Sequence, residues 1–156
     1  MHRSEPSADD LAQARALIAA RADEPGALLP ILHDMQDALG FVPASLVPEL
    51  ATALNLSRAE VHGVVTYYHH FRDAPPARRV VQLCQAESCK AMGADALRAH
   101  AEARLGTTLG GRSADGEVDL EAVYCLGLCA VSPAMAIDDA VHGRVTPARF
   151  DRLVAR

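Results

Sequence analysis

The chain has 156 residues, enough for one medium domain or two small ones. Half of the residues are apolar and 22% are charged, which is typical of a folded globular protein. The net charge is −5 without a long basic run, which argues against nucleic-acid binding. No apolar stretch reaches the roughly 18–20 residues that span a bilayer, and no signal-peptide core follows Arg3. We therefore expect a cytoplasmic protein without direct membrane insertion.

The first seventy residues carry only helical patterns. A capping box at Ser7 opens an alanine-rich helix that extends to about Arg21. Apolar residues at helical spacing predict a second helix over residues 28–39, with Gly40 as its C-terminal cap.

Two more helices are predicted before residue 70. Ser45 is the expected cap of the third, which places Pro48 in its first turn. Ser57 and Glu60 form a second capping box. The buried face of this fourth helix is expected to consist of Val61, Val64, Val65 and Tyr68.

A proline-rich linker over residues 73–78, centred on Pro75-Pro76, divides the helical part (residues 1–72) from a second domain (residues 79–156). The second part alternates between strands and helices, in the order β-α-β-β-α. This indicates an α+β protein in which a small α/β unit follows a helical one. The predicted elements are strand 80–84, helix 91–105, strand 118–124, strand 134–138 and a helix from Pro147. After a turn at Asp138-Asp139, residues 141–145 are a candidate hairpin partner of the third strand.

The four cysteines form two spaced pairs, Cys84-x4-Cys89 and Cys125-x3-Cys129. Each pair follows a predicted strand, and two strand ends of one small sheet can bring four thiolates together. Four thiolates suit tetrahedral zinc or an iron–sulfur cluster. The wide spacing favours a [2Fe–2S] cluster, in which each pair holds one iron, but zinc and free or disulfide-bonded cysteines stay open.

The second pair lies in an apolar loop. Leu126, Leu128 and Val131 can screen a cluster from water. Gly127 lets the backbone approach the sulfurs, where N–H groups can hydrogen-bond to them and tune the reduction potential.

Three segments resemble the thioredoxin-like [2Fe–2S] subunit of NADH dehydrogenase-type complexes, the family of the 24-kDa subunit of complex I. Residues 29–43, ending in Gly-Phe-Val-Pro, look like the family's helix and connector. Residues 60–68 look like its Glu-Val-x-Gly-Val segment, with Tyr67 where Phe is commoner. Met92-Gly93-Ala94 follows the first cysteine pair as in the family. The resemblance covers roughly residues 26–156.

The resemblance implies a fold, a cofactor and a role. It implies an N-terminal helical docking domain, a thioredoxin-like [2Fe–2S] domain, and one cluster held by Cys84, Cys89, Cys125 and Cys129. The chain would be a non-catalytic electron-transfer subunit of a flavin- and NAD-dependent oxidoreductase. FMN and NAD are expected on a partner subunit, and this chain carries no nucleotide-binding motif.

The first cysteine loop refines the choice of complex. Residues 84–94 are most similar to the gamma subunit of NAD-dependent formate dehydrogenase, which implies a molybdenum-containing subunit in the larger assembly. Complex I and NAD-reducing hydrogenase are the alternatives within the family.

Two function classes outside the family stay open. One is a zinc-stabilised adaptor without redox activity, and the other is a thiol–disulfide protein. The second is disfavoured, because a redox pair is usually Cys-x-x-Cys. His62 and His69 are expected to be solvated or to lie in an interface, because two histidines lack the ligand count of a metal site.

Overall fold

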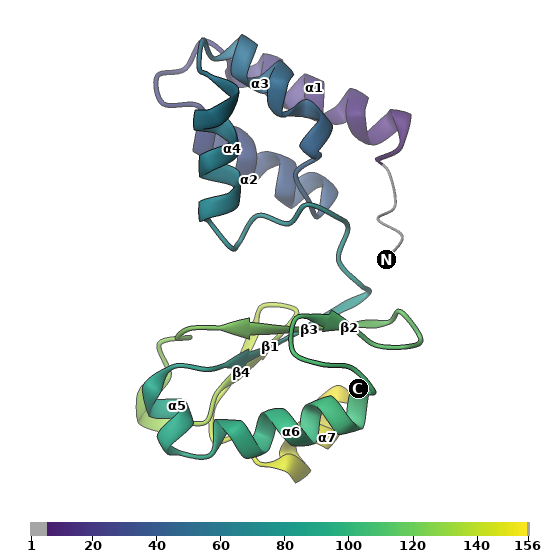
Figure 1. The fold of residues 1–156 in the computed structure, drawn as a ribbon, viewed down its shortest axis with the longest axis vertical. Coiled ribbons are helices and arrows are strands. Elements are labelled where there is room, and N and C mark those ends of the chain that lie inside the picture. The colour runs from purple at the N-terminus through teal and green to yellow at the C-terminus, as the bar shows by residue number, and fades with distance from the viewer. Residues whose placement is uncertain (1–5, 156) are drawn as a thin grey trace. The chain divides into compact units, whose positions relative to one another are not determined.

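The computed structural model describes residues 6–155. The chain divides into two compact units, Met1–Pro76 and Ala77–Arg156, each with its own apolar core. The first is helical and the second is built on a mixed five-stranded sheet (Figure 1). The predicted α+β class, with helices preceding an α/β unit, is confirmed. Among the described residues, no helix is both long enough and apolar enough to cross a membrane.

Over residues 6–76, five helical segments form the first unit, and local signals fix their ends. Both predicted capping boxes are present, at Ser7 with Asp10 and at Ser57 with Glu60. Gly40 adopts the left-handed conformation expected of a C-terminal cap, with φ 81°. The segments are α1 (Ala8–Arg21), α2 (Leu28–Leu39), the 3-10 turn η1 (Ala44–Leu46), α3 (Val47–Ala53) and α4 (Arg58–Tyr67).

Two details of this unit differ from the sequence expectation. Ser45 does not cap the third helix, because a 3-10 turn fills residues 44–46 and α3 begins only at Val47. Pro48 does lie in the first turn. Tyr68 is not on the buried face, because α4 ends at Tyr67 and the chain turns into an extended conformation there. Its side chain is 44% exposed, and of the predicted stripe only Val61 is fully buried.

The side chain of Gln36, on α2, forms hydrogen bonds with the segment that follows α4. Its side chain is buried, and its Oε1 accepts a hydrogen bond of 2.8 Å from the backbone N–H of Arg72. Its Nε2 donates to the carbonyl oxygen of His70. The amide therefore pairs two backbone groups of an irregular segment that has no helical ladder of its own.

The sheet of the second unit has the strand order β2-β3-β1-β4-β5. The central strand β1 runs parallel to β3, and the other neighbours are antiparallel. In this register Cys84 lies opposite Val123, two residues before Cys125. The parallel pairing therefore brings the chain after β1 and the chain after β3 to the same edge. The strands are β1 (Arg79–Cys84), β2 (Gly111–Arg112), β3 (Val118–Val123), β4 (Met135–Ile137) and β5 (Ala140–His142).

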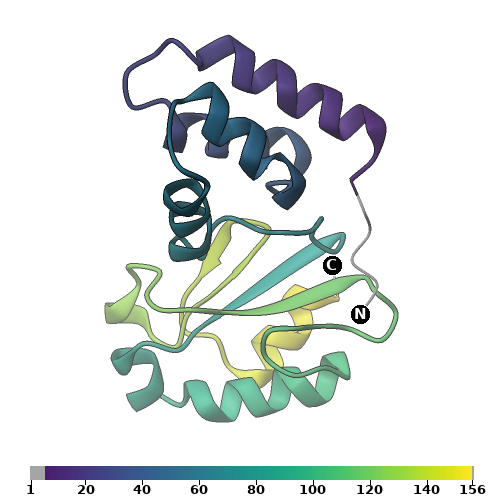
Figure 2. The ribbon, with the colours of Figure 1, turned by 45° about the horizontal axis from the view of Figure 1, so that its top comes forward.

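Helices α6 (Ala94–Leu105) and α7 (Pro147–Val154) pack beside each other on one face of this sheet (Figure 1; Figure 2). Phe150, Leu97 and Ala101 are buried between helices and strands. The predicted helix 91–105 is shorter than expected. Gly93, with φ 96°, separates α6 from a short helix α5 (Glu87–Ala91) that holds Cys89. Strand β2 was not predicted, because two residues carry no periodicity.

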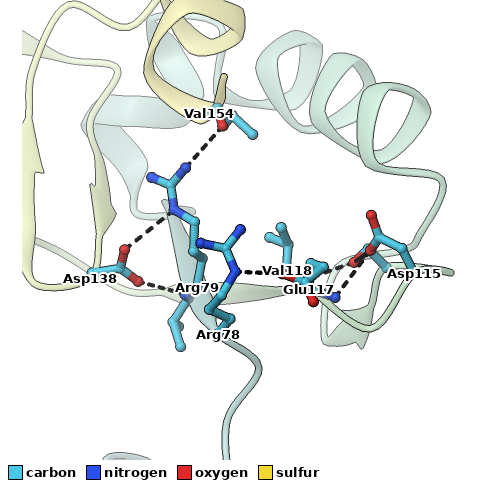
Figure 3. A network of polar contacts seen from close by, with 9 residues as sticks. Arg78, Arg79, Asp115, Glu117, Val118, Asp138 and Val154 are labelled. Carbon is cyan, nitrogen blue, oxygen red and sulfur yellow. Dashed lines mark hydrogen bonds and ion pairs between the residues drawn. The ribbon is translucent and has the colours of Figure 1, made fainter. Parts of the chain in front are cut away.

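Acidic side chains hold the beginning of β1 (Figure 3). Asp138 accepts the backbone N–H of Val80 at 2.8 Å and pairs with Arg79 Nε at 3.4 Å. Arg78 pairs with Glu117. These contacts join β1 to the turn between β4 and β5 and to the beginning of β3.

Candidate metal centre

The four cysteines lie at the edge of the sheet where β1 and β3 end. Cys84 is the last residue of β1, and Cys89 lies in α5; both are buried. Cys125 follows β3, and Cys129 opens a 3-10 turn, η2 (Cys129–Val131); both are exposed. The structure thus brings the two predicted pairs together, one inside and one at the surface.

In the exposed pair the sulfur atoms are in contact: the Sγ atoms of Cys125 and Cys129 are 3.8 Å apart. In the buried pair, Cys89 is among the groups that raise the pKa of Cys84, after the larger effect of burial. Cys84 and Cys89 both contribute to raising the pKa of Cys129, after the larger effect of Cys125. Over residues 6–155, no three histidine, cysteine or acidic side chains are arranged around a single metal ion.

A backbone N–H group points at one of the sulfurs. The N–H of Gly127 donates to Cys125 Sγ at 3.4 Å, as predicted for this loop. The backbone of Ala86 and Leu126 acts to lower the pKa of Cys84 against the larger effect of burial. Cys125 itself adopts φ 114°, a strained conformation for an L-residue.

Apolar side chains surround the buried cysteine pair. Three residues were predicted to screen the cluster from water, and two of them lie against this pair. Leu126 and Leu128 pack against Cys84 and Cys89 together with Ala94 and Ala134. Val131 instead lies against Gly143, and its carbonyl accepts the N–H of Arg144.

Burial and neighbouring groups shift the pKa values of three of the four thiols. Burial raises the pKa of the Cys84 thiol. Burial also acts to raise the pKa of Cys89, but hydrogen bonds with Ser132 and Cys84 outweigh it and lower that pKa. The neighbouring Cys125 raises the pKa of Cys129, by hydrogen bonding and by charge. Adjacent thiolates repel, and a bound cation removes that repulsion, so metal binding would stabilise all the ionised thiols together.

The donor set fits a [2Fe–2S] cluster. Such a cluster takes four cysteine thiolates, two per iron, and hydrogen bonds to its sulfurs. The chain offers two thiol pairs, apolar cover on the buried pair and a backbone N–H group aimed at Cys125 Sγ. All four cysteines are free in this structure.

Sequence reasoning missed two serines of the site. Ser88 and Ser132 hydrogen-bond to each other across the two cysteine loops. Ser88 could have been noticed because it lies inside the first Cys-x4-Cys loop, but nothing in the sequence pairs it with Ser132.

Two histidines of the helical unit and two charged residues of α5 are exposed. His62 and His69 are exposed, as expected. The ring centroids of His33 and His70, also in the helical unit, are 5.4 Å apart with the rings tilted by 37°. Glu87 and Lys90 are exposed on α5.

The fold and the site define a small α/β domain that carries four cysteines at the ends of parallel strands. Residues 14–156 match the model of one protein family, described as thioredoxin-like [2Fe-2S] ferredoxin. The chain belongs to this family, which confirms the resemblance seen in the sequence and the thioredoxin-like fold of the second unit.

Relatives in this family are subunits of redox enzymes. The chain is 36% identical to a subunit of the NADH-quinone oxidoreductase of Rhizobium meliloti, over 85% of this chain and 79% of that protein. It is 28% identical to the HndA subunit of the NADP-reducing hydrogenase of Solidesulfovibrio fructosivorans, over 83% of this chain and 76% of that protein.

A solved structure of an NAD⁺-reducing [NiFe]-hydrogenase, in the air-oxidised state, is similar with a TM-score of 0.68. The two are 30% identical, and the match covers 83% of this chain and 22% of the hydrogenase chain. The chain therefore matches only about a fifth of that hydrogenase subunit.

Proposed function

We propose that this chain is a one-electron carrier, the [2Fe–2S] subunit of a flavin- and NAD-dependent oxidoreductase complex. Its ligands are Cys84, Cys89, Cys125 and Cys129. The observation that carries the proposal is the meeting of two thiol pairs at adjacent ends of parallel strands, with the backbone N–H of Gly127 directed at Cys125 Sγ. The names of the NADH-quinone oxidoreductase and hydrogenase relatives support it.

When bound, the cluster accepts and releases single electrons without proton or bond exchange. The protein supplies an insulated inner side and an open outer side for this. Cys84 and Cys89 are buried under Leu126 and Leu128, whereas Cys125 and Cys129 are exposed. The Cys125–Cys129 edge would therefore be the side at which a partner exchanges electrons with a bound cluster, because these two cysteines are exposed.

The parent complex that we favour is a molybdenum-containing, NAD-dependent formate dehydrogenase, with this chain as its gamma subunit. The sequence of residues 84–94 supports this assignment, and complex I or NAD-reducing hydrogenase would use the same subunit. FMN and NAD then belong to the flavin subunit that receives or supplies the electrons. A cluster that needs free thiols fits a reducing compartment such as the cytoplasm.

The helical unit is proposed to dock the flavin subunit. Tyr67 is 74% exposed at the end of α4 and stacks edge-to-face on Tyr68. Exposed aromatic side chains are enriched at protein interfaces. The boundaries proposed for this docking domain and its linker are residues 1–72 and 73–78.

The proposal is tested by the absorption and EPR spectra of full-length protein purified without oxygen, before and after dithionite. We expect a red-brown protein that gives the signal of one unpaired electron only after reduction. A colourless protein that holds zinc, even after iron and sulfide are supplied for reconstitution, would favour the adaptor and overturn the proposal.

Identity of the complex needs its own experiment. The complex is purified from its host through a tag on this chain, and formate, NADH or hydrogen is added to separate samples. If formate reduces the cluster and its EPR signal appears, the formate dehydrogenase assignment is supported. If the signal appears with hydrogen, or with NADH alone, the chain belongs to a hydrogenase or to complex I instead.

A further inference from the structure

Two serine hydroxyls join the two cysteine loops. Ser88, inside the first loop, and Ser132, beyond the second pair, have Oγ atoms 3.0 Å apart. Both hydroxyls also reach the carbonyl oxygen of Cys129, at 3.1 Å from Ser88 and 2.9 Å from Ser132. Ser132 Oγ lies 3.5 Å from Cys89 Sγ as well. The hydroxyl pair therefore contacts one cysteine of each loop.

Ser132 is the inner member of the pair. Its side chain is buried, whereas Ser88 is half-buried. Water therefore has little access to Ser132, and its hydrogen bonds are decided by the protein groups around it.

The number of hydrogens decides which group donates once Cys89 is ionised. Each serine has one hydroxyl hydrogen, and a thiolate can only accept. With Cys89 as a thiolate ligand, the charged sulfur attracts the hydrogen of Ser132 more strongly than a neutral carbonyl does. Ser88 then supplies its own hydrogen to the Cys129 carbonyl or to Ser132 Oγ. In either case Ser132 is released to donate to Cys89.

We propose that Ser132 is a positioning residue that raises the reduction potential of the cluster by donating a hydrogen bond to the ligand sulfur of Cys89, and that Ser88 acts through Ser132. This inference rests on the proposed function. Reduction adds one electron to the centre and moves no proton or bond. The centre gains one negative charge, so a hydrogen bond to its sulfur is stronger after reduction than before.

The test compares full-length Ser132→Ala, Ser88→Ala and the double variant in redox titrations followed by EPR. For Ser132→Ala we expect the equilibrium constant of one-electron reduction to fall by about three- to tenfold; tenfold corresponds to about 59 mV. Ser88→Ala is expected to lower it less, because Ser132 then divides its hydrogen between two acceptors. The double variant should match Ser132→Ala, and Ser132→Thr, which keeps the hydroxyl, should restore the potential of the natural chain.

Ser113 provides a matched control. It is as buried as Ser132 and belongs to the same unit. Its hydroxyl donates a hydrogen bond to the Asp115 carboxylate and accepts one from the backbone N–H of Val118. Ser113→Ala should lower stability and leave the potential unchanged.

Each outcome has one meaning. An unchanged potential in Ser132→Ala, or effects of the two serines that simply add, would overturn the inference while leaving the proposed function in place. If Ser132→Ala does not retain a cluster, the Ser88→Ala potential decides, and an unchanged value overturns the inference. A natural chain that holds no cluster overturns the proposed function and this inference together.

Discussion

The guanidinium of Arg79 joins the first strand of the sheet to the last helix: its Nη1 donates a hydrogen bond of 2.9 Å to the carbonyl oxygen of Val154 (Figure 3). Arg79 is the first residue of β1, the strand that ends at Cys84. The same guanidinium pairs with Asp138, and its side chain is only 16% exposed. One side chain thus holds β1, the β4–β5 turn and the end of α7 together.

Replacing Arg79 with Met should destabilise the second unit. The apolar stem is retained, but a charge-assisted hydrogen bond is lost and the Val154 carbonyl is left without this partner. We expect a loss of about 1.5–3 kcal/mol in the free energy of unfolding. Urea unfolding followed by far-UV circular dichroism measures it.

Arg78→Met is the matched control. Arg78 is the preceding residue and pairs with Glu117, but it is largely exposed, and exposed ion pairs contribute little to stability. Equal losses in the two variants would contradict the role given to Arg79.

Replacing either exposed cysteine with serine should remove the cluster without unfolding the chain. Cys125 and Cys129 lie outside both apolar cores, so the substitution costs little packing. A serine oxygen is a harder ligand than the thiolate that an iron–sulfur cluster requires. Iron affinity should therefore fall by more than the roughly 10–100-fold that follows loss of a ligand's supporting contacts.

Iron and acid-labile sulfide are measured beside the far-UV spectrum, with Ser113→Ala as the control. The buried residues Cys84 and Cys89 should behave in the same way, with an added loss of stability. A serine variant at any of the four positions that keeps a full cluster with a normal EPR spectrum would show that its cysteine is not a ligand.

The features that could be predicted from the sequence are those that residues close together in the chain determine. The capping boxes at Ser7 and Ser57 each need residues three positions apart, and both form. The cysteine pairs could be assigned to strand ends because β1 and β3 carry their own apolar pattern. The parallel register of the two strands then brings the pairs together.

The missed features depend on contacts that are distant in sequence. Ser88 and Ser132 are 44 positions apart, and no local pattern relates them. Strand β2 forms because Gly111 and Arg112 meet Leu120 and Asp119 across a turn, not because of its own two residues. Tyr68 fits the helical stripe of α4, yet the helix ends one residue earlier.

The proposed docking role predicts that Tyr67→Ala weakens binding to the flavin subunit and leaves the fold intact. The side chain is 74% exposed, so its removal should change stability by no more than about 0.5 kcal/mol. Exposed aromatic residues at the centre of an interface act as hot spots, so we expect the dissociation constant to rise by about tenfold or more. Calorimetric titration of the flavin subunit with full-length protein measures it.

Phe71→Ala is the contrasting variant. Phe71 is 8% exposed and belongs to the core of the helical unit, so its truncation should cost about 3–5 kcal/mol of stability. Unchanged affinity in Tyr67→Ala would exclude Tyr67 from the interface.

The capping box of α4 predicts a pH dependence for the helical unit. The backbone N–H of Ser57 donates a hydrogen bond of 2.8 Å to the Glu60 carboxylate. The backbone and the side chain of Ser57 together hold the pKa of Glu60 below its ordinary value of 4.5. A depressed pKa means that the contribution of Glu60 to stability is fully present above the unfolded-state value and is lost as the pH falls through the folded-state value.

Stability of the natural chain and of Glu60→Gln is compared between pH 7 and pH 3, by denaturant unfolding of protein without cluster. The stability difference between the two should be constant above about pH 5 and should shrink below pH 4.5. An NMR titration of the Glu60 carboxyl gives the folded-state pKa directly, and Ser57→Ala should raise it. A difference that stays constant down to pH 3 would refute the linkage.

A side chain at position 143 is expected to weaken cluster binding through a steric clash. A Cβ atom built on this residue would lie 2.5 Å from Val131 Cγ2 and 2.9 Å from the Val131 carbonyl oxygen. Val131 ends the turn that begins at Cys129. Its carbonyl also accepts the N–H of Arg144, so the two segments cannot separate without losing that bond.

Gly143→Ala should therefore displace residues 129–131 and the Cys129 ligand with them. We expect a loss of about 1–3 kcal/mol in stability, typical of overpacking, and faster release of iron to a chelator. Gly63→Ala is the matched control, because a Cβ there meets nothing within 4 Å and alanine favours the helix by about 1 kcal/mol. If Gly143→Ala releases iron no faster than Gly63→Ala, then contact with Gly143 does not hold the Cys129 turn in place.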